Sequence, residues 1–156
     1  MSHKIIENIN LIEKDIRLKN EKVNIIAVSK TFSIENIKPL IDHGHIHFGE
    51  NKVQEAMQKW SDIKKISNNL KLHMIGKLQT NKVKYVIELF DYIHSVDNYK
   101  LAKKISEEEK KNGKKLKHFI QVNIGMEEQK NGIDIDNLND FYHHCNQELN
   151  LNVIGL

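Results

Sequence analysis

The sequence predicts an α/β protein built on a parallel sheet. Short apolar runs rich in β-branched residues alternate with longer stretches in which apolar residues recur at helical spacing. Strand–helix alternation of this kind forms right-handed βαβ units with parallel strands. Continuous apolar runs also suit parallel strands that are buried on both faces. Periodicity alone leaves two architectures open: an open doubly wound sheet, and part of an eight-stranded barrel.

The predicted elements follow one another without a linker rich in proline, glycine or serine. The chain opens with a helix whose isoleucines recur at helical spacing, namely Ile5, Ile9, Ile12 and Ile16. The second helix spans 33–43; Pro39 favours a late start or a kink there, and Gly44 suits its C-terminal cap. Further helical patterns cover 53–63, 83–90, 101–105 and 138–149. Six strands are predicted at 23–29, 46–48, 72–75, 92–95, 118–122 and 152–156.

Composition indicates one soluble globular domain over residues 1–156, with 39% hydrophobic and 29% charged residues. The net charge of +3 is small and spread along the chain, so no nucleic-acid partner is expected. Cys145 is the single cysteine, which rules out an intrachain disulfide, and helical spacing places it on the core side. Without a long apolar stretch, neither a signal peptide nor a membrane span is predicted, and we expect a cytoplasmic protein.

Polar or glycine-containing segments follow each of the first five strands. They are Ser29-Lys30-Thr31, Gly49-Glu50-Asn51, Gly76-Lys77-Leu78-Gln79, Ser95-Val96-Asp97 and Asn123. In barrels and in open α/β sheets alike, active sites lie at the C-terminal ends of the strands. We therefore expect these segments to converge on one mouth.

Lys30 is the most informative residue among them. It follows six largely apolar residues, so its amine should emerge at the rim of a buried strand. Partial burial there would favour the neutral amine that Schiff-base chemistry requires. The alternative is a lysine whose ammonium simply extends into water at a strand end.

Histidines raise two further possibilities. His43, His45 and His47 would share one face if they shared a strand, but no acidic or cysteine ligand is spaced to complete a metal site, and none is expected. His73 and His94 lie within predicted strands, either in a barrel interior or in the core.

Six motifs, in order, resemble the pyridoxal phosphate (PLP) homeostasis protein family, from about residue 5 to the end of the sequence. They lie at 27–31, 48–55, 73–82, 94–97, 121–132 and 155–156. The resemblance implies a (β/α)8 TIM-type barrel related to the N-terminal domain of alanine racemase, with about six of its eight strands present here. It implies that Lys30 holds PLP as a Schiff base and that Asn51 approaches the cofactor ring or its phenolic oxygen. By the same resemblance His73, Ser95 and Asn123 line the barrel mouth.

The family resemblance implies a protein that binds and buffers PLP inside the cell, with no settled catalytic activity and with PLP-dependent apoenzymes as candidate recipients. An alternative is a racemase-like enzyme acting on amino acids. That reaction needs a second acid/base group near Lys30, and the strand-end motifs contain no tyrosine. A third reading is a truncated fragment that cannot retain PLP.

Two departures from the family pattern stand out. Leu72 replaces the usual tryptophan before the histidine of the third motif. Family members also continue beyond this sequence with the last two strands and the phosphate loops, so we expect a truncated barrel. A complete barrel would be a monomer, whereas an open apolar edge favours association. Each missing charge-assisted phosphate contact would remove about 1.5–3 kcal/mol of affinity.

Overall fold

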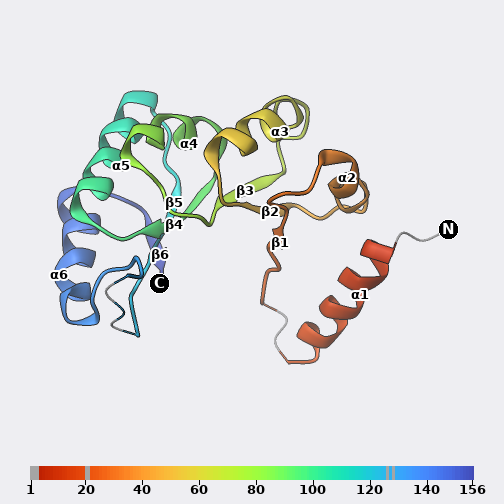
Figure 1. The fold of residues 1–156 in the computed structure, drawn as a ribbon, viewed down its shortest axis with the longest axis horizontal. Coiled ribbons are helices and arrows are strands. Elements are labelled where there is room, and N and C mark those ends of the chain that lie inside the picture. The colour runs from red at the N-terminus through yellow and green to blue at the C-terminus, as the bar shows by residue number, and fades with distance from the viewer. Residues whose placement is uncertain (1–3, 20–21, 126, 128) are drawn as a thin grey trace.

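The computed structural model describes residues 4–19, 22–125, 127 and 129–156, and one parallel sheet forms its centre (Figure 1). The strands are β1 (Ala27–Val28), β2 (His47–Glu50), β3 (Lys71–Met74), β4 (Tyr92–Val96), β5 (Lys117–Ile120) and β6 (Val153–Gly155). They lie side by side in chain order, and each neighbouring pair is parallel. A doubly wound sheet reverses its strand order at a switch point, whereas a barrel does not. The arrangement is therefore six successive strands of a (β/α) barrel.

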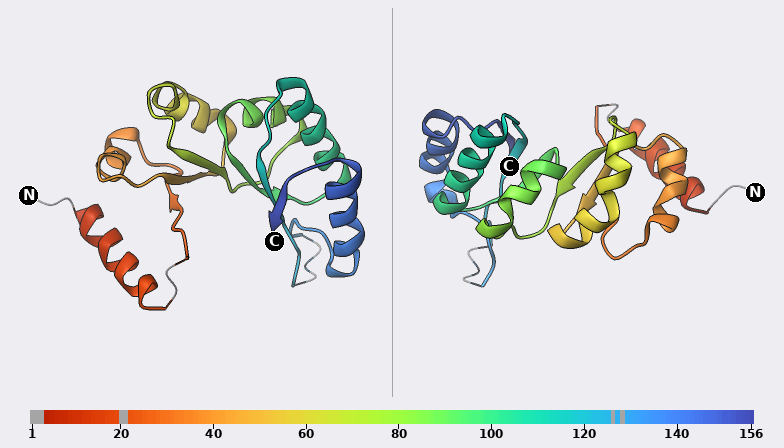
Figure 2. Two further views of the ribbon diagram at one scale, coloured as in Figure 1. Left: turned by 180° about the vertical axis from the view of Figure 1, so that it is seen from behind. Right: turned by 90° about the horizontal axis from the view of Figure 1, so that it is seen from above.

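Helices connect the strands on one side of the sheet, as all three views show (Figures 1 and 2). They are α2 (Ile34–Asp42), α3 (Val53–Ile66), α4 (Val83–Leu89), α5 (Tyr99–Asn112) and α6 (Leu138–His143), and α1 (Lys4–Arg17) precedes β1. The 3-10 turns Thr80–Lys82 and Ile135–Asn137 precede α4 and α6, and a π-helix at His144–Glu148 follows α6. Every predicted helix is confirmed. None of the described helices is long and apolar enough to cross a membrane.

The end of α2 follows from one glycine. Gly44 has a φ of 94°, its N–H donates to the Ile41 carbonyl at 3.0 Å, and the His45 N–H donates to the Leu40 carbonyl at 3.0 Å. These two bonds satisfy carbonyls at the helix end in the pattern of a Schellman motif, as Gly44 predicts. The expected late start is wrong, because α2 begins at Ile34 and contains Pro39.

The core lies between the sheet and its helices. Phe48 of β2 packs on Trp60 of α3 with ring centroids 5.0 Å apart, and both side chains are fully buried. Since side chains alternate along a strand, His47 and Gly49 face the opposite, inner side of the sheet. Cys145 is buried on the helix side, as predicted, and burial raises the pKa of its thiol to about 12.

The first strand is shorter and less covered than its sequence suggests. β1 contains only Ala27 and Val28, and the Val28 side chain is 50% exposed. The prediction that 23–29 is buried on both faces is therefore wrong. The reason is that β1 is an edge strand, hydrogen-bonded to β2 alone among the described strands. At the other edge, Ile154 of β6 is also exposed.

Candidate functional site

The predicted strand-end segments do share one edge of the sheet. Val28 pairs with Gly49, so Lys30 and Asn51 lie two residues beyond paired positions of β1 and β2. The Ile75 N–H donates to the Glu50 carbonyl at 2.9 Å, which continues the register past the end of β3. The C-terminal edge therefore brings Lys30, Asn51 and the segment from Gly76 onto neighbouring strands.

Lys30 sits in a tight turn directly after β1. The Phe32 N–H donates to the Ser29 carbonyl at 3.3 Å, which closes the turn around Lys30 and Thr31. Thr31 has a φ of 68°, a conformation that is a true outlier for a β-branched residue. Lys30 itself is exposed, so the expected partial burial of its side chain is wrong for this chain. The strained turn leaves Lys30 exposed at the C-terminal edge of the sheet.

A buried carboxylate lies beneath this turn. Glu50 is fully buried at the end of β2, and its Oε1 accepts hydrogen bonds from Ser29 Oγ at 2.7 Å and from Trp60 Nε1 at 3.0 Å. Lys59 Nζ donates to the same oxygen at 2.9 Å. Sequence reasoning missed this cluster, although a glutamate that ends an apolar strand beside Asn51 is an available signal.

Three buried polar atoms near the edge have no hydrogen-bond partner among the described residues. They are Glu50 Oε2, Asn51 Oδ1 and Ser95 Oγ, and the Ser95 side chain is 2% exposed. Buried polar atoms in proteins are nearly always satisfied, so unsatisfied ones at a strand edge indicate a place for a polar ligand. The polar ring substituents of PLP fit this requirement, and Lys30 lies at the end of β1, the strand next to β2.

Gly76 allows the backbone of Asn51 to approach. A Cβ at this position would lie 2.2 Å from the Asn51 carbonyl oxygen and 2.8 Å from its Cα. We expect Gly76→Ala to displace Asn51 and to lower the free energy of unfolding by about 1–3 kcal/mol, the usual range for overpacking. Denaturant unfolding measures this loss. Gly125→Ala is the control for general glycine effects, since the φ of Gly125 is not positive and a Cβ there would first meet the end of the flexible Glu127 side chain, at 3.1 Å. Equal stability of Gly76→Ala and wild type would contradict the close approach.

Asn123 is placed by the loop that follows β5. Its side chain is 9% exposed, and its Nδ2 donates to the Glu127 carbonyl at 3.0 Å. Its N–H donates to the Ile133 carbonyl at 2.9 Å. Gly132, with a φ of 134°, lies so close that a Cβ would come within 2.6 Å of the Asn123 nitrogen. Asn123 is therefore held firmly at the sheet edge.

His73 lies within β3 and belongs to a chain of histidines across the inner face. His47 Nδ1 and His73 Nε2 are 2.9 Å apart, and His73 Nδ1 and His94 Nε2 are also 2.9 Å apart. The ring of Tyr92 stacks on His73 with centroids 4.1 Å apart. His73 and His94 therefore belong to the barrel interior, which was one of the two alternatives.

The histidine chain resists protonation. Burial, followed by the nearby His94 and His47, lowers the pKa of His73 to about 3. Burial lowers the pKa of His94, and burial together with His45 lowers that of His47. A neutral chain forms these hydrogen bonds, because each ring then has one donor and one acceptor nitrogen.

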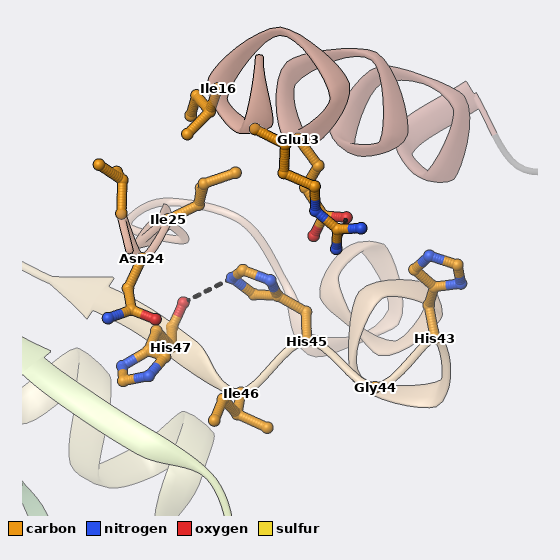
Figure 3. A pocket seen from close by; sticks show the side chains of 11 residues that line it. Glu13, Ile16, Asn24, Ile25, His43, Gly44, His45, Ile46 and His47 are labelled. Carbon is orange, nitrogen blue, oxygen red and sulfur yellow. Dashed lines mark hydrogen bonds and ion pairs between the residues drawn. The ribbon is translucent and has the colours of Figure 1, made fainter. Parts of the chain in front are cut away.

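The three closely spaced histidines do not converge. His43 Nε2 lies 3.2 Å from Asn10 Oδ1, His45 Nε2 donates to the His47 carbonyl at 2.9 Å, and His47 turns toward β3 (Figure 3). They line a cavity of about 400 Å³ between α1 and the start of β2, at the opposite end of the sheet from Lys30. Among the residues that the structure describes, no group of three potential metal ligands is placed to hold an ion.

Comparison with known proteins agrees with this geometry. The model of the alanine racemase N-terminal domain family matches residues 2–156. The chain belongs to this family. Two curated family relatives, both named pyridoxal phosphate homeostasis protein, come from Buchnera aphidicola (38% identical over 96% of this chain and 68% of the relative) and Aquifex aeolicus (37% identical over 85% and 57%). The chain thus spans only part of the length of these relatives.

Solved structures of related proteins have the same fold as this chain. PipY of Synechococcus elongatus PCC7942, solved without PLP, is 33% identical with a TM-score of 0.79 over 90% of this chain and 64% of PipY. PipY with PLP bound has a TM-score of 0.75 over 86% of this chain and 62% of PipY. Alanine racemase of Clostridium difficile 630 is 18% identical with a TM-score of 0.68 over 95% of this chain and 38% of the racemase, and shares the fold alone. The predicted barrel class, with six strands in this chain, is confirmed.

Proposed function

We propose that this chain binds PLP on Lys30 and takes part in intracellular PLP homeostasis without committed catalysis. The observation that carries the proposal is that an exposed lysine in a strained turn and the unsatisfied polar atoms of Asn51 and Ser95 lie toward the same C-terminal edge of the sheet. The names of the relatives and the PLP-bound PipY structure support it.

Each proposed site residue has a part that its position allows. Lys30 supplies the amine, and PLP supplies an aldehyde that an amine can take up as a Schiff base. Asn51 and Ser95 orient the cofactor through the buried atoms that lack partners. Asn123 closes the mouth on the β5 side. His73, with both ring nitrogens engaged by other histidines, forms the inner wall.

A racemase-like activity is the second candidate, and the positions of two tyrosines count against it. Tyr99 follows β4, but its ring packs on Phe141 and His144 of the helix layer. Tyr92 begins β4 and stacks on His73, so it lies toward the N-terminal end of the sheet, away from Lys30. A group that moved a proton opposite Lys30 would have to stand at the other end. We therefore favour a carrier, which holds and releases cofactor.

The remaining aspects of this function follow from the carrier role. We propose that residues 1–156 act as one incomplete barrel domain in the cytoplasm, with PLP-dependent apoenzymes as recipients and without nucleic-acid or membrane partners. Association through the exposed edge strands β1 and β6 is proposed as well, since both leave backbone groups available for pairing. A fragment that cannot retain PLP is the outcome that would replace the carrier role.

The test is direct trapping of the bound cofactor. The purified chain is mixed with PLP, the visible absorbance of the imine is recorded, and the adduct is reduced with borohydride and located by peptide mapping. We expect one adduct per chain, on Lys30. Weak labelling scattered over many lysines would overturn the proposed function.

A further inference from the structure

We propose that Glu50 and Lys59 are positioning residues, which hold the turn that carries Lys30 in the conformation that takes up PLP. The inference rests on the proposed function, because it assigns a role in the reaction of Lys30. Neither side chain belongs to the predicted binding set. Both lie beneath the turn rather than in the space above the strand ends.

The contacts reach the residue directly before Lys30 by two routes. Lys59 Nζ donates to the Ser29 carbonyl at 2.8 Å, and Ser29 Oγ donates to Glu50 Oε1 at 2.7 Å. Lys59 also donates to Glu50 at 2.9 Å, so one ion pair fixes both the carbonyl and the side chain of Ser29. The Glu50 side chain is fully buried and that of Lys59 is 12% exposed. Bonds to charged groups in such a place are strong and directional.

The turn needs such support. Thr31 has a φ of 68°, and strained backbone conformations of this kind persist only where the surroundings enforce them. The Ser29 carbonyl that accepts from Lys59 is also the acceptor for the Phe32 N–H that closes the turn. Removing the ammonium therefore loosens the same carbonyl that sets the direction of Lys30.

An ion pair with a purely structural role would bond to other parts of the fold than the residue next to Lys30. Lys64 and Asp91 form such a pair at 2.7 Å, and its other bonds go to the backbone of Leu70 and Leu72, at the start of β3. The bonds of Lys59 instead go to the C-terminal edge and to the residue next to the proposed amine. This difference in location points to a role in the cofactor site.

The experiment compares variants of the full chain by titration with PLP and by borohydride mapping. Lys59→Met keeps the aliphatic stem and removes the ammonium; we expect the apparent Kd of the Lys30 adduct to rise about tenfold, equivalent to 1.4 kcal/mol. Hydrogen exchange of the Phe32 amide should become faster in the same variant. Lys59→Arg should restore most of the affinity. Lys65→Met, which removes an exposed lysine of α3, is the matched control and should behave as wild type.

A second variant covers the case in which Lys59→Met does not fold. Glu50→Gln combined with Lys59→Met leaves no buried charge, and replacing both members of a buried pair is far better tolerated than removing one. The same tenfold loss is expected. Wild-type affinity for PLP in either folded variant would overturn the inference while leaving the proposed function intact. Absence of a Lys30 adduct in the wild-type chain would overturn the proposed function, and the inference with it.

Discussion

Lys30→Met is expected to abolish the borohydride-trapped PLP adduct and the visible absorbance of the imine. Methionine replaces the aliphatic part of the lysine side chain but has no amine, so the covalent link cannot form. Lys30 is exposed and no hydrogen bond or ion pair of its side chain supports the described fold, so the free energy of unfolding should change by less than about 0.5 kcal/mol. Loss of binding without loss of stability separates a cofactor lysine from a structural one.

The control for this prediction is another exposed lysine of the same region. Lys38 lies on α2 and pairs with Asp42 one helical turn away, with its side chain 66% exposed. Lys38→Met should retain a full adduct on Lys30. If Lys30→Met still gave one adduct per chain, located on another lysine, the assignment of the site would be wrong.

The fold was largely predictable because its information is local. Short segments with apolar residues alternate with stretches of 3.6-residue periodicity, and these patterns located every described strand and helix. The order of the strands was not local information. It became visible only in the register of the pairs, such as Phe48 with Leu72, which turned two possible architectures into one.

The sequence predicted the residues at the edge of the candidate site, but not the residues that pack beneath them. Lys30 and Asn51 follow strands directly, so sequence position alone placed them at the shared edge. Glu50 and Lys59 meet only because β2 and α3 pack face to face, which no spacing rule specifies. The histidine chain likewise requires the register between strands, since His47, His73 and His94 come from three of them.

The histidine chain makes the stability of the protein depend on pH. His73 has a pKa of about 3 in the folded chain and an ordinary value of 6.5 when unfolded. Below the unfolded value the unfolded chain binds the proton and the folded chain does not. The contribution of His73 to the free energy of unfolding is therefore fully present above about pH 6.5, and it is lost as the pH falls toward the pKa of the folded chain.

The size of the loss follows from the two pKa values. His73 alone should remove about 2 kcal/mol of unfolding free energy near pH 5, and about 3 kcal/mol near pH 4. His47 and His94 act in the same direction, because their pKa values are also lowered. Asp91 is lowered as well: burial opposes its ionisation, but bonds from Lys64 and the Leu72 N–H outweigh that effect. Its contribution is lost only at more acidic pH, so the range near pH 5 reports on the histidines.

Denaturant unfolding at about pH 7.5 and about pH 5 measures this dependence. His73→Phe keeps a ring to stack on Tyr92 but cannot bind a proton, so the difference in unfolding free energy between the two pH values should shrink by about 2 kcal/mol. His143→Gln, at the exposed last residue of α6, should leave the difference unchanged. An equal acid loss in His73→Phe and wild type would mean that the chain of rings is not the origin of the effect. A protein that holds its inner histidines neutral therefore loses stability in acid through the inner face of its sheet, where these three rings come from neighbouring strands.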